Sequence, residues 1–200
     1  MLSFAALAAA THAGAATTVL DFEDISSVNF LGALPPGYAG FSWQSAAFMQ
    51  PAKYPYSPNS GYHSGTIGSV SIFNSWGKDL SMSRDLPFYF ASAYITAAWN
   101  LNETVAVEGW RDGVLKYTSA IKASSPGPVL YNFGFDDINR VVFRSSPEDG
   151  INAGYGGAGP HIVLDNISYS VSPVPEPSSW LLMGFGALTL LARRRFSNAG

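Results

Sequence analysis

The sequence contains no cysteine and few charged residues. Without cysteine the chain has no disulfide, no thiolate nucleophile and no thiolate metal site. Asp, Glu, Lys and Arg make up 12% of its 200 residues, and the net charge is −3. This leaves no basic field to attract a phosphate backbone, which argues against nucleic-acid binding. One folded domain is the simplest organisation for this length.

The middle of the chain also lacks a sustained apolar repeat of helical period, because Pro and Gly interrupt it throughout. Nine short apolar or alternating segments predict β-strands instead. The predicted strands are residues 17–23, 38–48, 69–74, 86–99, 104–110, 114–120, 129–135, 139–144 and 161–171. They predict an all-β fold over residues 17–171, an antiparallel β-sandwich that is jelly-roll-like.

A β-hairpin is the most specific local prediction. Arg111-Asp112-Gly113 separates the segments 104–110 and 114–120. Asp-Gly readily adopts the positive φ of a tight hairpin turn. We therefore expect these two segments to pair.

The first residues have the composition of a signal peptide. An apolar run leads into Ala13-Gly14-Ala15, which has the small-x-small form that signal peptidase cleaves. Residues 1–15 are therefore predicted to direct export, and a buried helix is the alternative.

The C-terminal region carries three signals in a fixed order: a Pro-Glu-Pro motif, an apolar stretch and an arginine cluster. The residues are Pro175, Glu176 and Pro177, then 180–192, then Arg193, Arg194 and Arg195. The apolar stretch is shorter than the ~20 residues that usually span a bilayer. Three adjacent guanidinium groups cannot enter a protein core, but they sit readily at cytoplasmic headgroups. We expect residues 179–195 to form a short transmembrane helix with its arginine cluster inside and the body outside.

This order resembles the PEP-CTERM sorting signal, a tail also described as an ice-binding protein C-terminal region. The resemblance implies handling by an exosortase and the membrane in Gram-negative bacteria that make exopolysaccharide. Residues 172–178 would be the Pro- and Ser-rich linker that carries the motif. The resemblance to the PEP-CTERM signal predicts a protein exported to the cell envelope. The protein would be either anchored in the membrane or released to the surface or matrix after processing. The tail implies nothing about ice binding or the role of the body.

The body resembles the lectin-like sandwich domains that often accompany this tail. The likeness rests on Leu20-Asp21-Phe22-Glu23 in the first predicted strand and Leu164-Asp165-Asn166-Ile167 in the last. It implies binding of a glycan such as exopolysaccharide, although the sequence has no diagnostic sugar-site signature.

Acidic residues near the first and last predicted strands suggest a structural calcium site. In many jelly rolls these strands are neighbours, which would bring Glu23 or Asp24 near Asp165. Carboxylate and carbonyl oxygens are the ligands that calcium prefers. Solvated strand-end acids are the alternative.

Aromatic residues of one predicted loop are candidate sugar-stacking groups. Tyr54, Tyr56 and Tyr62 lie among Pro, Ser and Gly, and loop tyrosines have less reason to be buried than strand tyrosines. We expect this loop, 54–62, to lie beside the Gly-rich loop 154–159 and to contact ligand.

The remaining motifs do not indicate catalysis. Residues 154–159 match G-x-G-x-x-G, but Pro160 and a β segment follow where a dinucleotide site needs a helix. His63 and His161 lie in no catalytic motif. We therefore predict a non-catalytic glycan- or exopolysaccharide-binding body. The alternatives are a structural envelope or biofilm-matrix protein and, third, an extracellular glycoside hydrolase that uses paired carboxylates.

Overall fold

The computed structural model describes residues 16–146 and 152–171. Every strand pairing in these ranges is antiparallel. The strands are β1 (Thr17–Leu20), β2 (Leu31–Ala33), β3 (Ser42–Gln44), β4 (Ala46–Met49), β5 (Ser71–Asn74), β6 (Leu80–Ala97), β7 (Glu103–Arg111), β8 (Val114–Ala123), β9 (Val129–Ser146) and β10 (Ile162–Ser170). Short helical turns are η1 (Tyr38–Gly40), η2 (Pro51–Lys53), α1 (Gly61–Ser64) and η3 (Ser75–Gly77).

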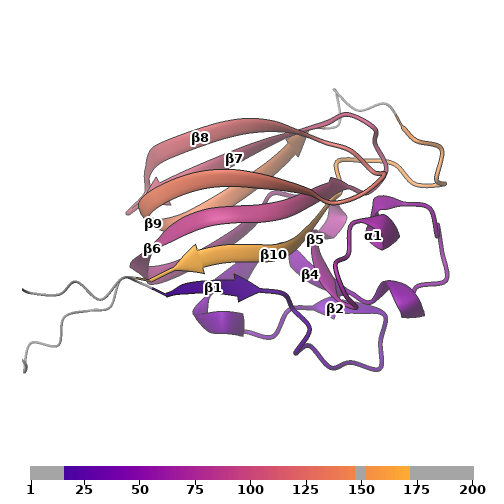
Figure 1. Ribbon diagram of the computed structural model, residues 1–200, viewed down its shortest axis with the longest axis horizontal. Helices are drawn as coiled ribbons and strands as arrows, with labels where there is room; N and C mark the ends of the chain where they lie inside the picture. The colour runs from indigo at the N-terminus through magenta and orange to yellow at the C-terminus, as the bar shows by residue number, and fades with distance from the viewer. Residues whose placement is uncertain (1–15, 147–151, 172–200) are drawn as a thin grey trace, which may run out of the picture. The chain divides into compact units, whose positions relative to one another are not determined.

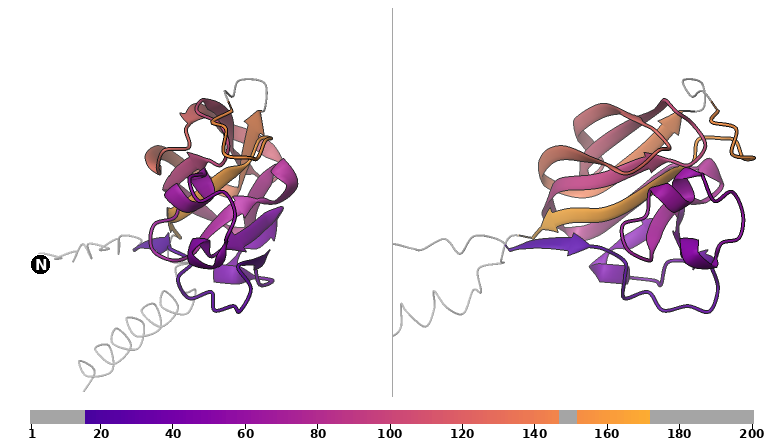
Figure 2. Two further views of the ribbon diagram at one scale, coloured as in Figure 1. Left: turned by 90° about the vertical axis from the view of Figure 1, so that its right-hand side faces the viewer. Right: turned by 45° about the vertical axis from the view of Figure 1, so that its right-hand side comes forward.

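The strands form one hydrogen-bonded network in the order β2-β4-β5-β10-β6-β9-β7-β8, with β1 on β10 (Figure 1). β3 pairs with β6. This architecture confirms the predicted all-β antiparallel sandwich. Figure 2 shows that the loops between β4 and β5 lie at the same end of the strands as residues 152–161, which precede β10.

Side-chain alternation along β6, β9 and β7 separates the core from the opposite face. Leu80, Phe143 and Val107 are cross-strand neighbours, and all three are fully buried. Because successive residues of a strand point to opposite faces, the positions between them face outward. Each of the three strands thus contributes one apolar side to the core.

The predicted hairpin is confirmed. β7 and β8 pair from Glu103 opposite Ala123 to Arg111 opposite Val114. Asp112 and Gly113 form the turn with φ values of 48° and 81°. Both values lie in the left-handed region that this tight turn requires.

Two long strands differ from the prediction. The predicted segments 129–135 and 139–144 are parts of the single strand β9. Asp137, which lies between them, has a φ of 49° but does not end the strand. β6 begins at Leu80 and continues through the polar residues before 86. Register shifts at these places are bulges, which add residues without ending a strand.

The predicted segment 38–48 is also divided. It contains η1, β3 and β4, and Ser45 separates the two strands with a φ of 56°. The short strand β2 was not predicted, because three residues carry too little pattern to identify a strand.

The predicted signal peptide (1–15), linker (172–178) and membrane helix (179–195) lie outside the described residues. In the ranges that are described, no helix has the length and apolar character needed to cross a bilayer.

Candidate functional site

Polar side chains gather on the outer surface of β3, β6, β9 and β7, which we call the polar face. Register pairing aligns these side chains in rows across the strands. One row is Ser42, Ser83, Arg140 and Trp110, and the next is Gln44, Ser81 and Glu108 with the buried apolar Val142 between Ser81 and Glu108. Residues from distant parts of the sequence therefore share one surface.

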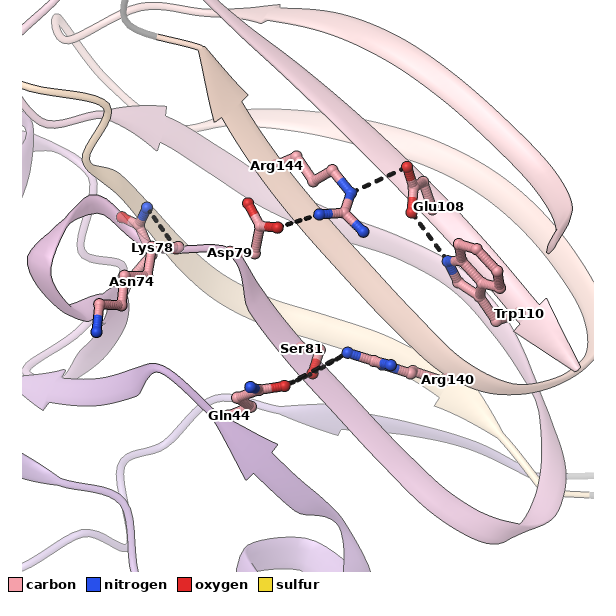
Figure 3. Close-up of polar contacts among 9 residues, drawn as sticks. All are labelled: Gln44, Asn74, Lys78, Asp79, Ser81, Glu108, Trp110, Arg140 and Arg144. Carbon is pink, nitrogen blue, oxygen red and sulfur yellow. Dashed lines mark hydrogen bonds and ion pairs between the residues drawn. The ribbon is translucent and has the colours of Figure 1, made fainter. Parts of the chain in front are cut away.

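An ion-pair network fixes part of the polar face (Figure 3). Arg144 Nε donates to Glu108 Oε1 at 3.0 Å, and Arg144 Nη1 contacts the carboxylate of Asp79. Trp110 Nε1 donates to the other oxygen of Glu108 at 2.9 Å. The hydrogen bond with Glu108 is the main cause that raises the pKa of Arg144. This arginine is therefore neutralised within the protein.

An open pocket of about 360 Å³ lies at one end of the polar face. It is lined by Ser42, Ser83, Arg84, Asp85, Asp112, Asn139 and Arg140. Asn139 Nδ2 donates to Asp112 Oδ1 at 2.8 Å, and the Asp112 N–H donates to Asn139 Oδ1 at 3.1 Å. These bonds fix the β7–β8 turn against β9. The volume falls within the ~300–1,000 Å³ of small-molecule sites.

The predicted tyrosine loop lies beside the Gly-rich loop. Gly156 packs near Ser57, and Tyr155 joins the apolar cluster of Tyr54 and Tyr62. No described helix follows the Gly-rich loop, because β10 begins at Ile162. This arrangement agrees with a connector and not with a dinucleotide site.

The three candidate tyrosines differ in exposure. Tyr56 is 62% exposed, and the half-buried Tyr54 contacts it edge to face with ring centroids 5.5 Å apart. Tyr62 is only 5% exposed and its hydroxyl lies 2.9 Å from Nδ1 of His161. The expectation that Tyr62 presents a stacking face is wrong, because the helical turn α1 directs its ring inward against Trp99. Stacking by Tyr54 and Tyr56 stays a prediction.

Trp76 is exposed and held in an unfavourable backbone conformation. Its side chain is 87% exposed and its φ is 59°. The buried amide of Asn74 fixes this segment: it donates to the Lys78 and Pro160 carbonyls at 3.1 and 2.8 Å and accepts the Ile162 N–H at 2.7 Å. Strained residues of this kind concentrate at binding sites, so Trp76 joins Tyr56 as an exposed aromatic candidate.

Trp76→Asn should make the protein more stable. Asn adopts the left-handed region at lower cost than Trp, and the exposed ring loses little packing, so the gain should be about 1 kcal/mol. Denaturant unfolding of the full chain in detergent measures it. Trp110→Asn is the control and should be destabilising, because Trp110 lies in a strand and donates to Glu108. A Trp76→Asn variant less stable than the parent would show that the ring packs in the fold.

The first and last strands of the body are neighbours, as predicted. Leu20 in β1 lies opposite Ile167 in β10. Just after β1, Glu23 Oε1 accepts the backbone N–H groups of Ser69 and Val70 at 2.7 and 3.0 Å. This carboxylate holds the loop that leads into β5.

The other two acids of the predicted calcium site are also hydrogen-bonded within the protein. Asp165 accepts the N–H groups of Ile67 and Asn166, both at 2.7 Å, through different oxygens. Asp24 accepts the hydroxyl of Tyr38 at 2.6 Å. In the part of the chain that the structure describes, no three His, Cys, Asp or Glu side chains group as metal ligands. Calcium binding at Glu23, Asp24 and Asp165 stays a prediction.

The pocket residues Arg84, Asn139 and Arg140 were not identified from the sequence. Arg84 and Arg140 line the same pocket only because β6 pairs with β9 beside a register shift. One local signal was available: Arg144 lies four positions after Arg140 in a predicted strand, and an even offset places both side chains on one face.

Residues 173–195 match the PEP-CTERM protein-sorting motif. The match confirms the sorting signal that ends in the arginine cluster. It supports an exported, envelope-associated protein that is processed by an exosortase. The PEP-CTERM motif covers the tail only, and no curated protein matches the chain. The lectin-like resemblance of the body gains no support from these comparisons.

Proposed function

We propose that the body is a non-catalytic module that binds polysaccharide outside the cell, through the pocket on the polar face. The pocket itself carries the proposal: it is open and is lined by Arg, Asp, Asn and Ser side chains. These groups donate hydrogen bonds to sugar hydroxyls and accept them. The PEP-CTERM tail supports export, which gives the body access to exopolysaccharide. Anchoring of the body by residues 179–195 is part of the proposal.

Asp165, a carboxyl group with a raised pKa, is not placed to act as a glycosidase acid. A glycosidase needs a carboxylic acid of raised pKa that can reach the glycosidic oxygen. Burial raises the pKa of Asp165 to about 7, but the side chain is 0% exposed and both of its oxygens accept backbone N–H groups. It cannot protonate a bound sugar.

Filling the pocket tests the proposed function. Ser83→Trp places a large ring in the pocket without removing a buried side chain. We expect it to weaken polysaccharide binding at least tenfold, equivalent to about 1.4 kcal/mol. Affinity electrophoresis of the full chain in detergent against a panel of bacterial exopolysaccharides measures the effect.

Two further variants locate the binding surface. Thr118→Trp adds the same ring at an exposed position opposite Glu108, outside the pocket, and should bind like the parent. Tyr56→Ala should lose affinity only if the tyrosine loop binds sugar. Loss in Tyr56→Ala but not in Ser83→Trp would move the site to that loop. A parent protein that binds no polysaccharide would overturn the function and favour a structural role in the envelope or matrix.

A further inference from the structure

The body contains four arginines, and two of them are neutralised by carboxylates. Arg111 Nε lies 3.1 Å from Asp112 Oδ2 and 3.9 Å from Asp137 Oδ1. Arg144 pairs with Glu108 and with a second carboxylate. These arginines have no free charge to offer a ligand.

The other two arginines, Arg84 and Arg140, line the pocket and have no carboxylate partner among residues 16–146 and 152–171. Arg84 Nε is buried without a hydrogen bond, and the guanidinium carbon lies 5.4 Å from the ring centroid of Phe41. Arg140 Nη2 has only long contacts, 3.4 Å each, with the neutral side chains of Gln44 and Ser81 (Figure 3). A buried guanidinium donor without a partner costs free energy that an anion would recover.

The acidic residues of the pocket do not cancel these charges. Asp112 is already engaged by Arg111 and Asn139. Asp85 is exposed and lies in the pocket with no ion partner among the residues described. The pocket therefore combines two arginines, Arg84 and Arg140, that have no carboxylate partner with one carboxylate, Asp85, that can accept hydrogen bonds from hydroxyl groups.

We propose that the pocket binds an acidic sugar unit of a polysaccharide, with the sugar carboxylate at Arg84 and Arg140. This inference rests on the proposed function and names its ligand class. The planar guanidinium fork matches a carboxylate through two parallel hydrogen bonds. Asp85 repels a simple anion but accepts hydrogen bonds from hydroxyl groups, and a uronate carries both kinds of group. The pocket volume and its open mouth fit one unit of a continuing chain.

The test compares polymers that differ only in charge. Polygalacturonate, alginate and polyglucuronate are each paired with their methyl esters, which keep the sugar rings and remove the carboxylate charge. The full chain in detergent should bind at least one free acid about tenfold more tightly than its ester. The preference should weaken with added salt, because these charges lie partly in solvent.

Three arginine variants assign the preference to the pocket. Arg84→Gln and Arg140→Gln should each remove most of it while leaving the melting temperature near that of the parent. Arg144→Gln, on the same face but outside the pocket, should keep it. Using two pocket variants keeps the test decisive if one of them fails to fold.

The outcomes separate the two proposals. If the parent binds esters and free acids equally and Ser83→Trp abolishes both, polysaccharide binding stands and the acidic-sugar inference fails. The inference also fails if Arg84→Gln and Arg140→Gln retain the preference for the free acid. If the parent binds neither the acids, the esters nor the bacterial exopolysaccharides, the proposed function itself fails.

Discussion

The unfolding free energy should contain a component of several kcal/mol that is lost between about pH 4 and pH 7, and Asp165→Asn should remove it. Burial raises the pKa of Asp165 from 3.8 to about 7, against the opposing effect of hydrogen bonds from Ile67 and Asn166. The nearby charges of Glu23 and Asp21 raise it further.

The direction of the effect follows from proton binding. The unfolded chain releases the Asp165 proton near pH 3.8, whereas the folded chain keeps it until about pH 7. Between these values the folded state binds more protons, so each pH unit lowers its stability by up to about 1.4 kcal/mol. The contribution is fully present below about pH 4 and is lost as pH rises through 7.

Denaturant unfolding of the full chain at pH 4, 5.5 and 7 measures this component as the difference between parent and variant. Asp165→Asn is neutral throughout, but its amide NH₂ group faces a backbone N–H, which costs about 1–3 kcal/mol. The variant should therefore be less stable than the parent at pH 4 and gain on it toward pH 7. Asp85→Asn, at an exposed carboxylate, is the matched control. Parallel profiles for the parent and Asp165→Asn would contradict the prediction.

Local sequence signals predicted the parts of the fold that depend on neighbouring residues. Asp112-Gly113 predicted the β7–β8 hairpin because the turn is set by two residues of known backbone preference. The sequence pattern instead divided one strand into the segments 129–135 and 139–144, whereas Asp137 adopts a left-handed conformation inside β9. A bulge and a turn use the same residue types, so composition alone does not separate them.

The candidate site depended on information that a sequence does not carry locally. Asp165, in the last predicted strand, was expected to lie near Glu23 or Asp24, but its hydrogen bond to the Ile67 N–H is set by the loop before β5. Likewise, every arginine has the same charge in the sequence. The structure distinguishes Arg84 from Arg111 by showing that only Arg111 has a carboxylate beside it.

Replacing Arg193, Arg194 and Arg195 by Ser should abolish correct sorting of the protein. The PEP-CTERM match ends at this cluster, and the apolar stretch before it is shorter than a typical span. Basic residues at the cytoplasmic surface each contribute about 1 kcal/mol of attraction to anionic lipid, so losing three weakens membrane retention roughly a hundredfold. Cell fractionation and the mass of the exported body measure retention and processing.

Two control variants separate membrane retention from recognition by the exosortase. Substituting Lys at all three positions keeps the charge that holds the C-terminus inside, so this variant should remain in the membrane fraction. Glu176→Ala alters the Pro-Glu-Pro motif and leaves the apolar stretch and arginines intact, so it should insert but escape processing. A triple Ser variant that is retained and processed like the parent would show that the arginine cluster is dispensable. Retention in the triple Lys variant with loss of processing would show that the exosortase reads the guanidinium groups as well as their charge, because lysine lacks the planar fork.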